Sequence, residues 1–433
     1  MVVRKTVCLH RLGGSRGGEL RAGRFFANRK VTAARIIDSS REPTARAVAG
    51  RHVLAIDDTS EIKFPTTAQR RRGLGPIGRG TTYGLLVHAM IAVDADSGAC
   101  LGLVGGEIWT RPGVAITPHQ DRPPEERESA RWVNAAEHAK QVLHQATMVT
   151  VVDDRESDIY AKWASVPTER CHLLTRARCD RRLADDGMLF ATIAQCPLQG
   201  QREIMLPARD PGRPKRTATL ELRYAAVTIC RPESEWDRSL PETVTLRCIE
   251  VREIGAPDGV EPMLWRLLTT HEIADAENAW QVVGWYLLRW VIEQLFRVMK
   301  AQGLQLEDSQ MTSAAGLEKL TAMAVKAACI DIQLVQERDG THHLPASVVF
   351  SEPEIETLTV LIPALEGKTQ RQRNLHPVGS LAWAAWAIAR LGGWNCYYKP
   401  PGPITMRRGM EQFYPIHRGR MLEMRLQRDV RIP

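Results

Sequence analysis

The stretch HVLAIDDT, residues 52–59, decides the fold, because a buried-strand pattern ends there in two consecutive carboxylates. Two further strand patterns follow at 84–94 (GLLVHAMIAVD) and 100–111 (CLGLVGGEIWTR). Gly-rich or Asp/Ser/Gly turns separate the three segments. Together they predict the beginning of a β-sheet.

Helices and strands alternate after these segments. Residues 125–143 have helical spacing, and 148–154 (MVTVVDD) has the pattern of a buried strand. A short helix is expected from about Asp158, followed by a strand at 172–178 (HLLTRAR). The order of three strands, helix, strand, helix, strand indicates an α/β fold with a mixed sheet.

The residue pattern changes twice in the rest of the chain, first to strands and then to helices. Runs of β-branched residues with Pro, Gly and Asp turns predict an antiparallel β region inserted at about 198–273. From Ala276 onward the pattern is helical, and the expected helices lie at 284–303, 317–335, 353–365, 380–393 and, more weakly, 405–428.

Composition excludes several classes of protein. The nine cysteines include no C-x-x-C pair, so neither a zinc framework nor a disulfide scaffold is expected, and a reducing cytosol fits best. The longest apolar run is interrupted by His88 and is too short to span a bilayer. We therefore expect a cytoplasmic protein without a membrane partner.

The net charge of +8 is unevenly distributed along the chain. Residues 1–50 carry +8 and residues 368–433 carry +9, whereas residues 51–367 carry −9. Basic ends around an acidic centre suit a protein that holds a polyanion with its ends and binds metal ions in its middle. The alternative is a chance distribution of solvated charges.

The segment GWYLLRWVIEQLFRVMKAQG, residues 284–303, predicts one amphipathic helix with an unusual polar side. At about 100° per residue, five side chains fall within an arc of roughly 80°: Tyr286, Arg289, Glu293, Arg297 and Lys300. Apolar residues fill the opposite side. Taken alone, such a stripe is typical of a solvated face with i,i+4 ion pairs.

Acidic residues end two of the predicted strands, as Asp57–Asp58 and Asp153–Asp154. In mixed α/β sheets, ligands bind at strand ends. Two-metal chemistry on phosphodiesters needs two or three carboxylates from different elements, because Mg²⁺ takes oxygen ligands. Glu293 is a plausible third carboxylate. Strand alternation alone does not choose one residue within each acidic pair.

These residues together resemble the cut-and-paste DDE transposases of bacterial insertion sequences, in the insertion-sequence-four group. The signature of that group, Tyr-x₂-Arg-x₃-Glu-x₆-Lys, is matched by Tyr286, Arg289, Glu293 and Lys300. IDDTSE matches the first catalytic motif at Asp58, and VDDRESDIY matches the second at Asp154. RPG, ERESARW, MLWRLLTT and GSLAWAAWAIARLGGW extend the resemblance from about residue 22 to about residue 410.

The resemblance implies an RNase-H-like (retroviral-integrase-like) catalytic core with the inserted antiparallel β region and a mostly helical C-terminal part. In that core Asp58, Asp154 and Glu293 are the catalytic and metal-binding residues. They are expected to hold two Mg²⁺ or Mn²⁺ ions for hydrolysis of DNA without a covalent enzyme intermediate.

Further residues are implied to contact DNA. They are Tyr286, Arg289, Arg297, Lys300, Arg176, Arg178, Trp265 and Trp290. Trp265 matches the tryptophan that stacks on a flipped base when a DNA end forms a hairpin, and Trp290 matches a second aromatic there. Exposed strand arginines and core tryptophans are the alternatives for Arg176, Arg178 and the two tryptophans.

The family pattern also implies an arrangement of parts and partners. We expect a shortened basic DNA-binding segment at 1–50, the catalytic core at 51–315, and a helical region at 316–433 for DNA contact and dimerisation. Residues 1–20 lack helical periodicity, and the proline of YPIHRGR interrupts the expected dimerising helix. A homodimer would pair two transposon ends and join them to target DNA. The alternatives are a shortened, inhibitory transposase and a metal-dependent nuclease.

Overall fold

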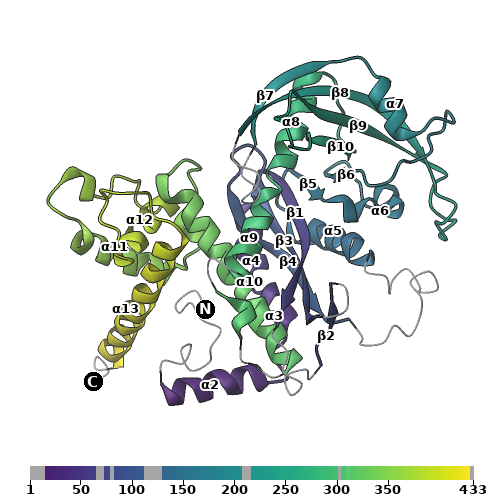
Figure 1. Ribbon diagram of the computed structural model, residues 1–433. Helices are drawn as coiled ribbons and strands as arrows, with labels where there is room; N and C mark the ends of the chain where they lie inside the picture. Colours follow the sequence, from purple (N-terminus) through teal and green to yellow (C-terminus); the bar gives the residue numbers. More distant parts are fainter. Residues whose placement is uncertain are drawn as a thin grey trace.

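The protein is built around one large β-sheet with helices on both faces (Figure 1). The computed structural model describes residues 15–64, 73–78, 82–111, 129–206, 216–300, 304–309, 311 and 313–429. The predicted features at 1–14, 112–113, 125–128, 301–303 and 430–433 lie outside these residues. No helix in the described ranges is long and apolar enough to cross a lipid bilayer. The mixed α/β architecture is confirmed.

The predicted strands of the first half are all present, together with a short additional strand. They are β1 (His52–Lys63), β2 (Gly75–Ile77), β3 (Thr82–Asp94), β4 (Cys100–Trp109), β5 (Met148–Asp153) and β6 (Cys171–Arg176). β3 is antiparallel to β1, β2 and β4, whereas β5 runs parallel to both β1 and β6. β1 continues beyond its predicted end at Asp58, because its last residues pair with β3 as far as Lys63.

Each face of the sheet packs into its own hydrophobic core. Side chains alternate along a strand, so Leu54 and Ile56 of β1 enter one core and Val53 and Ala55 enter the other. The first core is covered by α8 (Ala276–Leu287), α9 (Trp290–Lys300) and α10 (Ala314–Gln336). The second is covered by α5 (Ala130–Val142), α6 (Tyr160–Ser165) and α7 (Leu189–Gln195).

The predicted β region forms four antiparallel strands. They are β7 (Gly200–Leu206), β8 (Arg216–Cys230), β9 (Thr243–Ile254) and β10 (Leu264–Thr269). β10 pairs with β6, so this region extends the core sheet in the order β2-β3-β1-β5-β6-β10-β9-β8-β7, with β4 on β3. The curved outer strands are visible at the top of Figure 1.

The single helix predicted at 284–303 is wrong, because the chain breaks into α8 and α9 around Leu288 and Arg289. At the break, Arg289 N donates to Tyr286 O at 3.1 Å and Val291 N donates to Leu288 O at 3.0 Å, so the turn tightens to i→i−3 bonding. Arg289 is buried at this turn. Its contacts with the sheet, described below, offset the loss of regular helix.

Among the described residues, three short helices precede the sheet, although the sequence predicts no helix in residues 1–20. They are α2 (Arg16–Ala27), α3 (Ala33–Asp38) and α4 (Arg41–Ala47). Ser15 caps α2 by accepting a hydrogen bond from Gly18 N at 3.1 Å. The end of α2 is held on α10 by Lys319, whose Nζ donates to Phe26 O at 2.8 Å and to Asn28 O at 3.0 Å.

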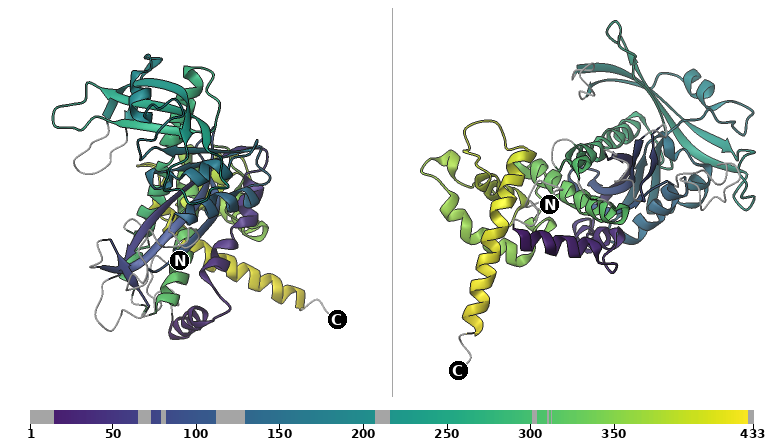
Figure 2. Two further views of the ribbon diagram at one scale, coloured as in Figure 1. Left: turned by 90° about the vertical axis from the view of Figure 1, so that its right-hand side faces the viewer. Right: turned by 60° about the horizontal axis from the view of Figure 1, so that its bottom comes forward.

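The predicted C-terminal helices are present as α11 (Glu352–Leu365), α12 (Leu381–Leu391) and α13 (Pro403–Asp429). The expected interruption at Pro415 does not occur, because α13 continues through it with the proline on an exposed position. The end of α13 projects away from the rest of the protein (Figure 2).

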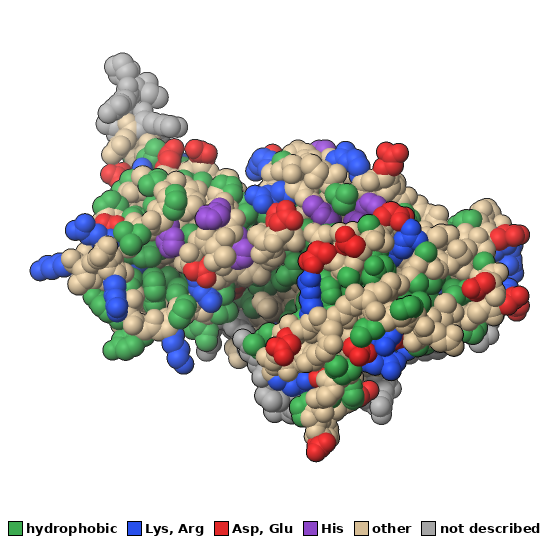
Figure 3. Space-filling view, turned by 90° about the horizontal axis from the view of Figure 1, so that it is seen from above, with side chains coloured by type: hydrophobic (Ala, Val, Ile, Leu, Met, Phe, Trp, Pro, Cys, Tyr) green, Lys and Arg blue, Asp and Glu red, His purple; other side chains and the backbone are tan. Residues whose placement is uncertain are grey.

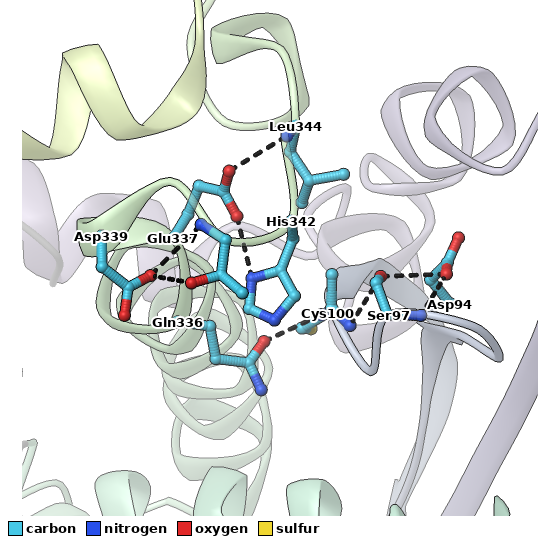
Figure 4. A network of polar contacts seen from close by, with 10 residues as sticks. Asp94, Ser97, Cys100, Gln336, Glu337, Asp339, His342 and Leu344 are labelled. Carbon is cyan, nitrogen blue, oxygen red and sulfur yellow. Dashed lines mark hydrogen bonds and ion pairs between the residues drawn. The ribbon is translucent and has the colours of Figure 1, made fainter. Parts of the chain in front are cut away.

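Polar contacts connect the end of α10 to the turn between β3 and β4 and to the following loop (Figure 4). Gln336 Oε1 accepts from Cys100 N at 2.8 Å. Glu337 Oε1 accepts from Leu344 N at 3.0 Å, and its Oε2 lies 3.0 Å from His342 Nδ1. The long helix is thereby fixed to both the sheet and the C-terminal region.

Candidate active site

Three carboxylates from separate elements gather on the face of the sheet that α8 and α9 cover. Asp58 lies in β1, two residues beyond Ile56, where the pairing of β1 with β5 ends. Asp154 directly follows β5, and Glu293 lies in the first turn of α9. Because alternate strand residues share a face, Asp58 is on the same side as Leu54 and Ile56.

Arg289 joins two of the three carboxylates. Its Nη1 lies 3.1 Å from Asp58 Oδ2, and its Nη2 lies 2.5 Å from Glu293 Oε1. The third carboxylate is held by Tyr286, whose hydroxyl donates to Asp154 Oδ1 at 3.4 Å. The break between α8 and α9 therefore brings three residues of the predicted signature, Tyr286, Arg289 and Glu293, to the acidic ends of two strands.

The geometry distinguishes the residues within each acidic pair, which the sequence alone leaves open. Asp57 and Asp153 are completely buried and face the second core. The side chains of Asp58 and Glu293 remain 22% and 30% exposed, respectively. Asp58 and Asp154 are therefore the members that face the α8–α9 side, as the family resemblance implies.

Burial and neighbouring charges shift the pKa values of three groups at this site. Burial raises the pKa of Asp58 to about 6; Arg289 opposes the shift, while Asp154 and Glu293 add to it. Burial also raises the pKa of Tyr286 to about 12, with a contribution from Asp154. Burial alone would lower the pKa of Arg289, but Tyr286 and the three carboxylates raise it above its ordinary value.

The donor chemistry of the site fits a hard divalent cation, because Mg²⁺ and Mn²⁺ prefer carboxylate oxygens. In the arrangement found, no three His, Cys, Asp or Glu side chains of the described residues are grouped closely enough to hold a metal ion. The Arg289 guanidinium instead supplies positive charge between Asp58 and Glu293. Asp58 and Glu293 are thus arranged around a cation, which here is the guanidinium of Arg289.

The two remaining cations of the stripe have different surroundings. Burial lowers the pKa of Lys300; Glu307 opposes this shift most strongly, and Asp58 opposes it more weakly. Arg297 lines a separate cavity of about 160 Å³ together with Asp331 of α10. Lys300 therefore belongs to the electrostatic environment of the site, whereas Arg297 lines a different surface.

The two predicted strand arginines also differ. Arg176 ends β6, donates from Nη2 to Leu264 O at 3.1 Å, and lowers the pKa of Tyr286 against the larger effect of burial. Arg178 is exposed beyond the strand, and its backbone N–H donates to Asp158 Oδ2 at 2.6 Å. Only Arg176 is thus connected to the tyrosine of the site.

Of the two predicted tryptophans, Trp265 is attached to the site through an aromatic contact. Its ring lies edge-on to Tyr286 with the centroids 5.1 Å apart, and it is only 8% exposed. Trp290 is half-buried at the start of α9, directly after Arg289. As found, Trp265 is packed against Tyr286 and offers little free surface.

Sequence reasoning missed a buried polar cluster on the opposite face, directly behind the three carboxylates. Lys162 of α6 is fully buried, and its Nζ donates to Asp153 Oδ2 at 2.7 Å and to Ser157 Oγ at 2.9 Å. Ser157 and Thr175 also donate to Asp153 Oδ2, at 3.0 and 3.2 Å. The signal available in the sequence was the strand alternation, which turns one member of each acidic pair inward.

The cluster continues from Asp153 across the sheet to β3. Burial raises the pKa of both Asp57 and Asp153, and the neighbouring Asp57 raises that of Asp153 further. His88 Nε2 lies 3.2 Å from Asp57 Oδ2, and its Nδ1 lies 2.9 Å from Thr59 Oγ1. Burial lowers the pKa of His88 to about 4, so this histidine is neutral at neutral pH.

Comparison with known proteins shows a distant structural similarity. No protein-family model matches the chain. Among solved structures, the chain is similar to piggyBac transposase in a synaptic complex with hairpin DNA, with a TM-score of 0.38 and 9% sequence identity. The alignment covers 87% of this chain and 56% of the transposase, so the chain spans a little over half the length of that protein.

Proposed function

We propose that the protein is a DDE-type DNA transposase that cleaves the ends of a mobile element and joins them to target DNA. The observation that carries the proposal is the gathering of Asp58, Asp154 and Glu293, from β1, the end of β5 and α9, around the guanidinium of Arg289. Three carboxylates on separate elements are the arrangement that two-metal phosphodiester chemistry needs. The proposed partners are transposon-end and target DNA, bound by a homodimer in the bacterial cytoplasm.

The proposed core is RNase-H-like. Its support is the order of elements along the chain: the antiparallel strands β1, β3 and β4, then α5, β5, α6 and β6, with β5 and β6 parallel to β1. This arrangement places the acidic residues of β1 and β5 on adjacent parallel strands. Such strand ends are favoured ligand sites in mixed sheets.

Asp58, Asp154 and Glu293 would hold two Mg²⁺ or Mn²⁺ ions. When bound, such ions lower the pKa of an attacking water or DNA 3′-OH and stabilise the leaving oxygen. Arg289 pairs with both Asp58 and Glu293, so it would have to release at least one of them if a metal ion were bound there. The released guanidinium is suited to bidentate contact with a DNA phosphate.

Other residues would orient the DNA. Lys300 supplies a point charge near Asp58, and Tyr286 fixes Asp154. Trp265 would stack on a flipped base, for which it must leave its edge-on contact with Tyr286. Arg176 is the better placed of the two strand arginines for a backbone contact near the site.

The test is a cleavage assay with the purified full chain, Mn²⁺ or Mg²⁺, and a duplex that carries the DNA flanking its gene. Asp58→Asn and Glu293→Gln should each abolish metal-dependent nicking and leave DNA binding largely intact. Asp38→Asn and Glu277→Gln serve as controls, because both carboxylates are exposed and lie outside the site. Normal nicking by either site variant would refute the assignment.

The same assay separates a transposase from a plain nuclease, which would give nicks and breaks without hairpins. If hairpins form, Trp265→Ala should reduce them by about tenfold to a hundredfold while the first nick survives, because base stacking is worth roughly 1–3 kcal/mol. Trp236→Ala is the control, since Trp236 is an exposed tryptophan. Equal hairpin yields from the unmutated protein and from Trp265→Ala would show that Trp265 has a purely structural role.

A further inference from the structure

A fully buried ion pair lies directly behind the three carboxylates, in the cluster around Lys162. Lys162 and Asp153 are both completely buried, with Nζ and Oδ2 2.7 Å apart. Desolvating an ammonium and a carboxylate costs several kcal/mol per ion, and well-packed apolar replacements are often as stable. Stability alone therefore gives no reason for this pair.

The position of the pair gives it an influence on the site. Asp57 and Asp58 are consecutive in β1, and Asp153 and Asp154 are consecutive at the end of β5. β1 and β5 are parallel neighbours up to the pairing of Ile56 with Val152, immediately before these acids. Asp57 and Asp58 are joined by a peptide bond, and so are Asp153 and Asp154. A change in the distance between Asp57 and Asp153 therefore also changes the distance between Asp58 and Asp154.

Lys162 controls the inner separation through charge and hydrogen bonding. It neutralises Asp153, whose Oδ2 accepts three bonds, from Lys162, Ser157 and Thr175. These donors come from α6, from the turn after β5 and from β6, so they fix the carboxylate in three directions. Without the ammonium, Asp153 Oδ2 would lose the shortest of these three bonds.

We propose that Lys162 is a positioning residue, which acts through Asp153 and Asp57 to set the separation of Asp58 and Asp154 across β1 and β5. This inference rests on the proposed function of Asp58 and Asp154 as ligands of divalent cations. Metal sites tolerate little displacement of their ligands, and changes in the groups that orient the ligands typically weaken metal binding about 10- to 100-fold.

The test measures Mn²⁺ binding to the full chain by isothermal titration calorimetry, independently of catalysis. Lys162→Met keeps the length of the side chain and removes its charge. It should weaken Mn²⁺ binding by about tenfold or more. The double variant Lys162→Met/Asp153→Asn removes both charges, and it should recover most of the lost affinity. Lys140→Met, which removes a partly exposed lysine of α5 paired with Glu137, is the matched control.

If Lys162→Met does not fold, Ser157→Ala provides a second test of the role of the contacts around Asp153. It removes a hydroxyl that donates to Asp153 at 3.0 Å and accepts from Lys162 at 2.9 Å. A lower melting temperature accompanied by unchanged Mn²⁺ affinity, in Lys162→Met or in Ser157→Ala, would show a merely structural role and overturn the inference.

Failure of the proposed function would look different. In that case the unmutated chain would bind no Mn²⁺, or would bind it as tightly as Asp58→Ala does. If Asp58→Ala abolishes Mn²⁺ binding while Lys162→Met leaves it unchanged, the proposed function stands and the positioning role falls.

Discussion

We expect ionisation of Asp58 to make the folded protein less stable at neutral pH than it is at acid pH. Burial, with Asp154 and Glu293, raises its pKa from 3.8 to about 6 in spite of Arg289. A carboxyl group with a raised pKa binds its proton more tightly in the folded chain than in the unfolded chain. Its favourable contribution is therefore complete below about pH 4 and is lost as the pH rises through about 6. This loss comes mainly from burial of the Asp58 carboxylate, with smaller contributions from Asp154 and Glu293.

Asp58→Asn should raise the free energy of unfolding at pH 7.5 by up to about 3 kcal/mol, because a shift of about 2 pKa units corresponds to this difference. The gain should shrink toward pH 4, where Asp58 is protonated in the folded chain. Urea unfolding at both pH values measures the effect, with Asp38→Asn as the exposed control. A loss of stability at pH 7.5 would mean that the bond to Arg289 outweighs the cost of burying the Asp58 carboxylate near Asp154 and Glu293.

At the scale of elements, local pattern was sufficient for strands that are continuous apolar runs. The strands at 52–59, 84–94 and 148–154 were predictable for this reason, and most of their apolar residues are buried whichever face they point to. β8 was predictable from its β-branched residues, and its burial alternates along much of the strand. The break between α8 and α9 was not predictable, because 284–303 keeps an amphipathic period across it. The bond of Arg289 to Asp58, 231 residues away in sequence, accompanies the turn there. The buried role of Lys162 was equally hidden, since it depends on contacts across β5 and β6.

The N-terminal helix α2 depends on a long-range contact of the same kind. Lys319→Met should release the end of α2 from α10, because it removes the buried donor to Phe26 O and Asn28 O. The expected cost is about 1–3 kcal/mol, the penalty for leaving buried carbonyls without a donor. Hydrogen exchange of residues 16–27 should accelerate, while that of β1 stays unchanged. Lys140→Met is the exposed control, and equal protection of α2 in both variants would contradict the contact.

At the scale of the whole molecule, charge is separated by region. The segments 1–50 and 368–433 carry +8 and +9, whereas 51–367 carries −9. Positive and negative side chains are interspersed on the face seen from above (Figure 3), so that face presents no continuous basic surface. The projecting part of α13 carries exposed arginines, including Arg418 and Arg425 (Figure 2). We therefore expect DNA to be held from the basic ends while its scissile phosphate reaches the acidic centre.

This expectation can be measured as the salt dependence of DNA binding. If Arg418 and Arg425 each contact a phosphate, replacing both with Gln should lower the slope of log K against log salt concentration by about 2, because each lost contact with duplex DNA contributes about 0.9. Fluorescence anisotropy of a labelled duplex over a range of KCl concentrations gives this slope. Arg238→Gln/Arg252→Gln is the matched control, since it removes the same charge from exposed positions in the β region. Equal slopes for the two double variants would show that net charge attracts DNA without contacts from α13. An unchanged slope for the α13 variant alone would exclude that helix from the DNA-binding surface.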